Sequence, residues 1–422
     1  MADDTCRAKS ESKPRVVEPQ RKQVVILYEL PEDKLPPTHP VRVLWSVVDT
    51  FNLSAFLDGV KAVEGRPGRP TLSPQMKLVL WLYAISNGVG SEKEIARLVE
   101  TDAAYRWVVG DLDVSHQTLS NFRAEHGAAL DHLMTDILAA LVHKDVLSLE
   151  LVAQDGMRVR AAASAPSFRR HESLLACREQ AALHLKAVLA QADDPESTRL
   201  QQAAREAGAR DFQRRVEEAI TTVTELQKTR RPSDKPARAS TTDAEARVMK
   251  MADGGFRPAY NVQLATAGSP LGGPRTIVGV QVTNVGSDMG SITPMLADIQ
   301  RRTGQLPSTL LADANHAAHD CIRAAADDGV TALVAVPQRS QQPGAKADDD
   351  PTIVAWRARM ETDEAKQIYR ARASLCELSN AHMRTHHGID QFLVRGLKKV
   401  TNVVLLGAIA ANLLQHARVL LE

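Results

Sequence analysis

Three acidic residues lie in segments that could present them to a ligand. Asp155 interrupts the run LVAQDGMRVRAAAS, which otherwise alternates apolar with basic or small residues, as a strand does. Asp313 ends the strand-like segment TLLAD, and the carboxyl ends of strands are where α/β sheets hold their ligands. Glu377 lies seven residues before Arg384 in a helical pattern, so the two side chains share one face, two turns apart.

Each of these acids also has an ordinary structural explanation. Asp155 followed by Gly156 between strand-like flanks is the sequence of a tight hairpin turn. Asp313 could cap the helix that the next residues begin, and a helical glutamate such as Glu377 is most often simply solvated. Taken one at a time, the residues leave these alternatives open.

Composition limits the class of protein without identifying a partner. The chain has 422 residues, 44% of them apolar, which is enough for two or three domains with a buried core. Its 52 basic residues nearly cancel its 51 acidic ones, so a nucleic-acid partner must be inferred from local patches. Four cysteines without a CxxC spacing argue against a zinc module or a disulfide framework. The polar opening segment and the short apolar run 403–411 indicate neither export nor a membrane span, so we expect a cytoplasmic protein.

The sequence pattern changes several times along the chain. Residues 1–23 form a charged, proline-containing tail that we expect to be disordered. Residues 24–146 place apolar side chains three and four apart, which predicts a helical domain. Residues 147–167 look like a strand, residues 168–239 like a two-helix hairpin with a polar linker, and residues 240–422 alternate strands with helices. The expected fold is an α/β sheet that is interrupted by a helical insertion and preceded by an all-helical domain.

One predicted helix of the amino-terminal domain carries the residues of a DNA-reading surface. Ser115 can cap this helix, and Gln117, Ser120 and Asn121 fall on one side of it. Arg123 is expected nearer the DNA backbone. Because Gln and Asn pair bidentately with adenine in a major groove, the helix fits a helix-turn-helix-like DNA-binding domain. An ordinary amphipathic helix with a solvated face is the alternative.

A signature in the last third of the chain gives these observations a common interpretation. It consists of Tyr369, Arg372, Glu377 and Arg384. This order resembles the tyrosine, arginine, glutamate, lysine signature of DDE transposases of bacterial insertion sequences, with an arginine here in the lysine position. The segments DGMRVRAAAS and LADANHAAHDCIRAAADDGV resemble the family's first and second aspartate motifs. The resemblance extends over nearly everything after the tail.

Two positions depart from the family pattern. Met157 stands where the first motif usually has threonine. Ala314, Asn315 and His316 replace a glycine-rich step that ends in tyrosine. Neither departure replaces a carboxylate, but the second could alter the loop beside Asp313.

The resemblance implies an RNase H-like fold, a mixed sheet with flanking helices, formed by residues 147–167 and 240–422. In that fold Asp155 lies in the middle of a central strand, Asp313 at the end of its neighbour, and Glu377 on a helix packed across the sheet. Three carboxylates so close repel one another unless they hold cations. Hard oxygen ligands suit two Mg²⁺ ions, with Mn²⁺ as a substitute.

The activity that the resemblance implies is transposition. The expected protein is a bacterial, nucleoid-associated transposase that binds the terminal inverted repeats of its insertion sequence. It would cleave DNA strands and transfer them, with metal ions and as a homodimer.

The resemblance also implies contacts with double-stranded DNA, both the inverted repeats and the target. Tyr369, Arg372 and Arg384 are expected to hold phosphates near the cleavage point. Further basic residues are expected to supply local positive charge, which the near-zero net charge of the chain does not reveal. These are Arg158, Arg160, Arg395 and Lys398.

Two other functions fit parts of the sequence. A domesticated, catalytically silent descendant of a transposase would bind DNA as a regulator, but a pure binder has no need of three clustered acids. His316 and His319, three residues apart beside Asp313, instead suggest a zinc-dependent hydrolase, although no third ligand is fixed by spacing. Mg²⁺-dependent cleavage of DNA would separate these interpretations.

Overall fold

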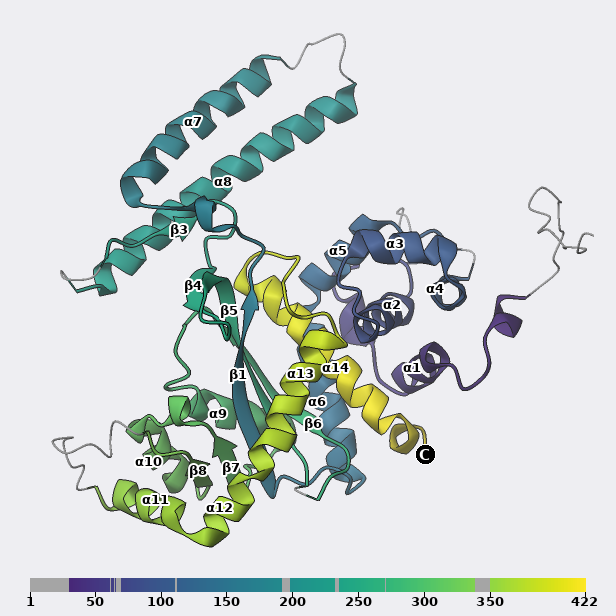
Figure 1. Ribbon diagram of the computed structural model, residues 1–422. Helices are drawn as coiled ribbons and strands as arrows, with labels where there is room; N and C mark the ends of the chain where they lie inside the picture. The colour runs from purple at the N-terminus through teal and green to yellow at the C-terminus, as the bar shows by residue number, and fades with distance from the viewer. Residues whose placement is uncertain are drawn as a thin grey trace, which may run out of the picture.

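The computed structural model describes residues 30–422 except 61, 64, 66–69, 111, 192–197, 232–234, 270 and 338–349. The tail 1–23, expected to be disordered, lies outside the described residues. The rest is a mixed α/β protein with a helical amino-terminal region and a mixed sheet flanked by helices, consistent with an RNase H-like core (Figure 1).

The amino-terminal region is helical, as the apolar spacing predicts. Its α-helices are α1 (Pro40–Asp49), α2 (Pro74–Ser86), α3 (Glu92–Thr101), α4 (Ala103–Val109), α5 (His116–Glu125) and α6 (Gly127–His143). The Ser115 hydroxyl accepts from the Thr118 N–H at 3.2 Å and begins α5, as predicted. Ser91 likewise caps α3, but Glu94 pairs with Arg97 at 2.6 Å and does not complete a capping box.

The sheet has six strands, in the order β4-β5-β1-β7-β8, with β6 also paired to β5. The strands are β1 (Leu151–Arg160), β4 (Arg247–Lys250), β5 (Phe256–Ala267), β6 (Thr276–Thr283), β7 (Thr309–Ala312) and β8 (Thr331–Val334). β1 is antiparallel to β5 and parallel to β7, which is parallel to β8. The sheet is therefore mixed, as expected.

The Asp155-Gly156 pair is not a hairpin turn. β1 continues straight through it, and the two residues pair with Leu264 and Gln263 of β5. Pairing with β5 keeps the segment extended, which a local turn signal does not reveal. Asp155 therefore lies in the middle of a central strand.

Helices cover both faces of the sheet. They are α9 (Ile292–Thr303), α10 (His319–Asp327), α11 (Pro351–Glu361), α12 (Asp363–Tyr369), α13 (Leu378–Thr385) and α14 (Leu397–Leu421), with a π-helical turn η6 (Ala373–Glu377) between α12 and α13. Ala153 and Leu311 on one face pack against Leu375 and Cys376 of η6. This face therefore lies under the helical segment that carries Glu377.

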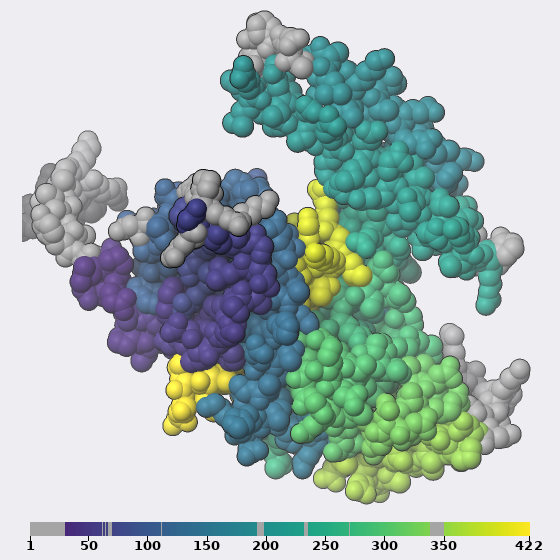
Figure 2. Space-filling model, turned by 180° about the vertical axis from the view of Figure 1, so that it is seen from behind, coloured from purple at the N-terminus to yellow at the C-terminus, as the bar shows by residue number. Residues whose placement is uncertain are grey.

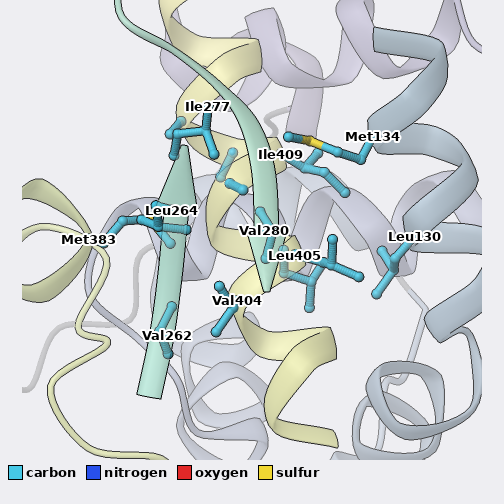
Figure 3. Packing of buried hydrophobic residues seen from close by; sticks show 14 of the residues in the cluster. Leu130, Met134, Val262, Leu264, Ile277, Val280, Met383, Val404, Leu405 and Ile409 are labelled. Carbon is cyan, nitrogen blue, oxygen red and sulfur yellow. The ribbon is translucent and has the colours of Figure 1, made fainter. Parts of the chain in front are cut away.

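α14 joins the helical region to the sheet. Its Leu405 and Ile409 lie between Met134 of α6 and Val280 of β6 in one continuous core (Figure 3). By length and composition alone α14 could cross a membrane, but 67% of its most apolar window is buried inside the protein. The apolar run 403–411 is thus part of a buried core helix, as the sequence predicts.

The helical insertion stands away from the sheet. It comprises α7 (His171–Ala190) and α8 (Arg199–Thr229), which pack on each other as the predicted hairpin (Figures 1 and 2). A separate small core at its base joins it to the short strands β2 (Phe168–Arg169) and β3 (Ala239–Ser240). Since little of either helix is buried, most of the hairpin surface is open to a partner.

Candidate active site

Asp155 and Asp313 lie side by side just beyond the point where the parallel pairing of β1 with β7 ends. In the register of β1 and β7, Ala153 is opposite Leu311, and the two aspartates each follow two residues later. Neighbouring strands lie about 4.8 Å apart, and residues two apart point to the same face. Both carboxylates therefore lie on the sheet face that η6 covers.

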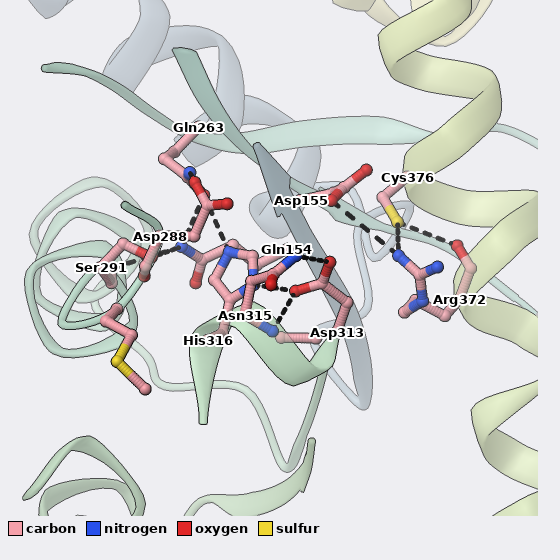
Figure 4. Close-up of polar contacts among 12 residues, drawn as sticks. Gln154, Asp155, Gln263, Asp288, Ser291, Asp313, Asn315, His316, Arg372 and Cys376 are labelled. Carbon is pink, nitrogen blue, oxygen red and sulfur yellow. Dashed lines mark hydrogen bonds and ion pairs between the residues drawn. The ribbon is translucent and has the colours of Figure 1, made fainter. Parts of the chain in front are cut away.

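The Asp155 carboxylate is held from the helical side. The Asn380 side-chain N–H donates to its Oδ2 at 3.0 Å. Arg372 Nη1 lies 3.9 Å from its Oδ1 (Figure 4). Burial raises the pKa of Asp155, the Arg372 charge opposes the shift, and the nearby Asp313 charge adds to it. A cation beside Asp155 would offset the charge that burial disfavours.

The Asp313 carboxylate is held from its own loop. Its Oδ1 accepts from the Asn315 backbone N–H at 2.9 Å and lies 2.6 Å from His316 Nδ1, while its Oδ2 accepts from the Asn315 side chain at 3.0 Å. Burial works to raise the pKa of Asp313, but hydrogen bonds and charge from His316 and Asn315 outweigh it and lower the pKa. The residue caps the short helix after β7, as its alternative explanation predicts, and still faces Asp155.

Glu377 is not gathered with the two aspartates. Its side chain is 56% exposed and its Oε1 lies 3.0 Å from Arg372 Nη2, so the guanidinium stands between Glu377 and Asp155. The helix expected over 361–387 is broken here by the wide turn η6, a type of turn that is frequent at functional sites. Among the residues that the structure describes, no three His, Cys, Asp or Glu side chains are arranged to hold a metal ion.

The donors at the two aspartates nevertheless fit a hard divalent cation. Asp155 and Asp313 offer carboxylate oxygens, and the buried Asn380 Oδ1 has no hydrogen-bond partner. Carboxylate and amide oxygens are ligands of Mg²⁺-like ions. Asp155, Asp313 and Asn380 therefore supply oxygen atoms of the kind that such an ion prefers, whereas Glu377 must turn and Arg372 must move before a third carboxylate can contribute.

Two family models match the chain. Residues 29–125 match the one described as "Transposase domain (DUF772)", and residues 351–417 match the one described as "Transposase DDE domain". Both models describe transposase domains. The second match includes Glu377 and Arg384, and the first includes α1 to α5. No curated protein and no solved structure matches the chain.

Asn380 is the site residue that the sequence analysis missed. It lies one turn after Cys376, and both side chains face Asp155 from the helical side. Burial, with the Asp155 charge, raises the pKa of the Cys376 thiol to about 12, so that Cys376 is no thiolate nucleophile. The four-residue spacing from Asn380 to Arg384 is the sequence signal that places Asn380 on the same helix face as the signature arginine.

The other signature residues contact the strands beside the two aspartates. The Tyr369 hydroxyl donates to the Ala312 carbonyl at 3.2 Å, and Arg384 donates to the Arg158 carbonyl at 3.1 Å. Arg158 itself pairs with Asp288 at 2.9 Å. The three groups expected to hold phosphates, Tyr369, Arg372 and Arg384, therefore lie near the aspartates, but each contacts a protein partner.

The outlying basic residues divide into paired and exposed ones. Arg160 pairs with Asp390 at 2.5 Å. Arg395 and Lys398 are exposed at the start of α14, where they line a cleft against α8 of the hairpin. The latter two are therefore placed for contact with a ligand on the surface.

The predicted DNA-reading face of α5 is only partly on the surface. Gln117 and Asn121 are exposed and joined by a 2.7 Å hydrogen bond, and Ser120 is half-buried. Arg123 is 3% exposed, pairs with Glu92 at 2.9 Å and stacks 4.4 Å from the Trp81 ring centre. The expectation that Arg123 contacts the DNA backbone is wrong, because helical spacing turns its side chain into the core beside Phe122.

His316 and His319 do not form a metal pair. His316 is bonded through its two ring nitrogens to Asp313 and Gln263, and the His319 ring lies edge-on to Trp356, with centroids 6.1 Å apart. The two imidazoles thus face different neighbours, which leaves the zinc-hydrolase alternative without ligands in the described part of the chain.

Proposed function

We propose that this chain is a transposase that binds the terminal inverted repeats of its insertion sequence and catalyses metal-dependent cleavage and strand transfer of DNA. The observation that supports this most is the Asp155 and Asp313 pair, level on parallel strands beneath the helix of Glu377. A test is to incubate the protein with Mg²⁺ and DNA carrying the element's ends, and to look for nicked and joined products. Products that also form without divalent metal would exclude the proposal.

The acidic residues of the site would hold the metal ions that the reaction needs. Two bound divalent ions would activate a water or a DNA 3′-hydroxyl and stabilise the leaving oxygen of an in-line attack on a phosphodiester. Asp155 and Asp313 would hold the ions, with Glu377 as the third ligand. The lowered pKa of Asp313 keeps it ionised at neutral pH, and Asn380 fixes one oxygen of Asp155 and leaves the other free to bind.

Arg372 would couple DNA binding to completion of the site. In the DNA-free protein its guanidinium neutralises Asp155 and Glu377 together and keeps them from sharing a cation. A DNA phosphate is a strong bidentate partner for arginine and would compete for this side chain. Once Arg372 turns to the phosphate, Glu377 can turn toward the aspartates.

Replacing Arg372 with alanine should therefore have opposite effects on metal and DNA. Without DNA, the variant should bind Mn²⁺ roughly tenfold more tightly, because a positive charge beside two carboxylates is removed. Cleavage of end-containing DNA should nevertheless fall, since the phosphate contact is lost. Isothermal titration with Mn²⁺ and a cleavage assay measure the two effects.

Arg370→Ala is the matched control for this charge, because Arg370 is exposed on the same helical segment. It should leave Mn²⁺ affinity unchanged. An Arg372→Ala protein with wild-type Mn²⁺ affinity would show that the guanidinium does not compete with a cation.

Sequence recognition should depend on the exposed amides of α5. Gln117→Ala or Asn121→Ala should reduce discrimination between correct and altered ends by about 1–3 kcal/mol for each lost base contact. Lys93→Ala, an exposed change on α3, should leave that ratio unaltered. Competition binding measures the ratio, and an unchanged preference in both amide variants would move recognition elsewhere.

The α7–α8 hairpin should serve dimer or DNA contacts. Between α8 and the start of α14 lies a cleft of about 1220 Å³ that is lined by both basic and acidic side chains, including Arg210, Arg215, Arg395 and Lys398. Replacing residues 171–229 with a short linker should weaken pairing of two DNA ends and leave Mn²⁺ binding intact. End binding, pairing and cleavage that all stay at wild-type levels would rule this role out.

A further inference from the structure

His316 lies beneath the candidate site and is completely buried. Its ring bridges two oxygens: Nδ1 is 2.6 Å from Asp313 Oδ1, and Nε2 is 3.0 Å from Gln263 Oε1 (Figure 4). The contact joins the carboxylate to a polar network on the other face of the sheet. The protonation of the ring follows from which partner atoms can donate.

The orientation of Gln263 is fixed by its far end. Its Nε2 donates to Asp288 Oδ1 at 2.6 Å, and Asp288 also accepts from Asn261 at 2.8 Å and pairs with Arg158 at 2.9 Å. A carboxylate with these partners only accepts hydrogen bonds. The Gln263 amide nitrogen must therefore face Asp288, and its oxygen must face His316.

Both ring nitrogens of His316 must then donate. The Gln263 oxygen cannot donate to Nε2, and the Asp313 carboxylate cannot donate to Nδ1. The ring is held here between a carboxylate and an amide oxygen. It fixes the rotation of the Asp313 carboxylate, whose Oδ2 is engaged only by the exposed Asn315 side chain.

We propose that His316 is a positioning residue that holds Asp313 in its metal-binding orientation by donating from both ring nitrogens. This inference rests on the proposed function. Outer partners that orient a metal ligand usually contribute about 10- to 100-fold to metal affinity. The network anchored at Asp288 and Arg158 keeps the imidazole itself from turning.

The test measures Mn²⁺ binding to the full chain without DNA, by the electron paramagnetic resonance signal of the free ion. His316→Phe removes both donors and should weaken binding by about 10- to 100-fold. His316→Asn can still direct an amide N–H at Asp313 and should recover much of the affinity. Ser291→Ala removes a hydroxyl that accepts from Gln154 at the far end of the same network. This variant should keep the wild-type Mn²⁺ affinity even if its melting temperature falls.

Asp313→Asn distinguishes a failure of this inference from a failure of the proposed function on which it rests. If Asp313→Asn loses Mn²⁺ affinity while His316→Phe keeps it, His316 has no positioning role and the proposed site stands. If the wild type binds no Mn²⁺, or Asp313→Asn binds it normally, the proposed site fails and the inference fails with it. Equal losses in His316→Phe, His316→Asn and Ser291→Ala would reduce His316 to a structural residue.

A measurement on the wild-type chain covers the case in which the variants do not fold. The measurement is a ¹⁵N-histidine NMR spectrum, in which the His316 signals are assigned by their loss in any soluble His316 variant or by their contact to Gln263. Both ring nitrogens of His316 should have the chemical shifts of protonated nitrogens. One protonated and one bare nitrogen would overturn the two-donor arrangement.

Discussion

Asp155→Asn and Asp313→Asn should each lower Mg²⁺-dependent cleavage of end-containing DNA by more than about 10³-fold. A bound ion supplies several kcal/mol of transition-state stabilisation, and each 1.36 kcal/mol is a factor of ten. The neutral amide keeps the shape of the side chain but loses the charge that holds the ion. Binding to DNA ends should persist and even tighten, since one acid near the phosphates is gone.

The same two substitutions should change stability in opposite directions. Burial raises the pKa of Asp155 in the folded chain, so the ionised carboxylate destabilises the fold once the pH rises through that raised pKa. Asp155→Asn should therefore raise the melting temperature at pH 7. The pKa of Asp313 is lowered, so it stabilises the fold above its unfolded pKa and loses this effect as pH falls through the folded one. Asp313→Asn should therefore lower the melting temperature at pH 7.

Asp320→Asn is the control for both variants. Asp320 is 95% exposed on α10 and pairs only along its own helix with Arg323 among the contacts described. Neither cleavage nor stability should change appreciably. Cleavage at the wild-type rate by Asp155→Asn or Asp313→Asn would remove that residue from the catalytic site.

Gly156→Ala should damage both the fold and the site. A Cβ at this position would lie 2.2 Å from Gln263 Nε2 and 2.7 Å from Asp288 Oδ1. The network that holds Gln263 must shift, and overpacking of this kind costs about 1–3 kcal/mol. Because Gln263 orients His316, cleavage should fall by up to about 10²-fold, the effect of an ångström-scale misplacement at a reacting centre.

Gly208→Ala is the matched control for the added methyl group. Gly208 lies within α8, and a Cβ there meets nothing within 4 Å. This change should stabilise the chain by about 0.5–1 kcal/mol and leave cleavage unchanged. Denaturant unfolding of both variants provides the comparison. A Gly156→Ala protein as stable and active as the wild type would mean that the polar network tolerates displacement.

Local sequence patterns predicted most elements but not the arrangement of the site. Periodic spacing of apolar residues predicted the helices before residue 146 and the paired strands β5 and β6. β5 is nevertheless buried on both faces from Pro258 to Ala267. The turn signal at Asp155-Gly156 was overridden by pairing with β5, more than 100 residues away in sequence. Long-range partners of this kind leave no local trace.

Two side chains show why the site could be predicted only in part. The π-helical turn η6 places Cys376 and Asn380 toward Asp155 and leaves the Glu377 side chain pointing outward. Residue spacing in the sequence does not distinguish a π-helical turn from a regular α-helical one. Arg123 is basic and near the exposed amides of α5, yet its charge is satisfied inside by Glu92 and the Trp81 ring. Residue type alone does not separate such a buried cation from a phosphate ligand.

The most direct test of the central claim is a nicking assay with a labelled duplex that carries the inverted repeat flanking the reading frame. We predict that wild-type protein with Mg²⁺ nicks this DNA at the repeat boundary and leaves a 3′-hydroxyl. EDTA should stop the reaction, and Glu377→Gln should abolish it while retaining binding, whereas Glu364→Gln, an exposed change on α12, should not. Tight binding of the repeat with no nick in Mg²⁺ or Mn²⁺ would contradict the claim and indicate a DNA-binding regulator.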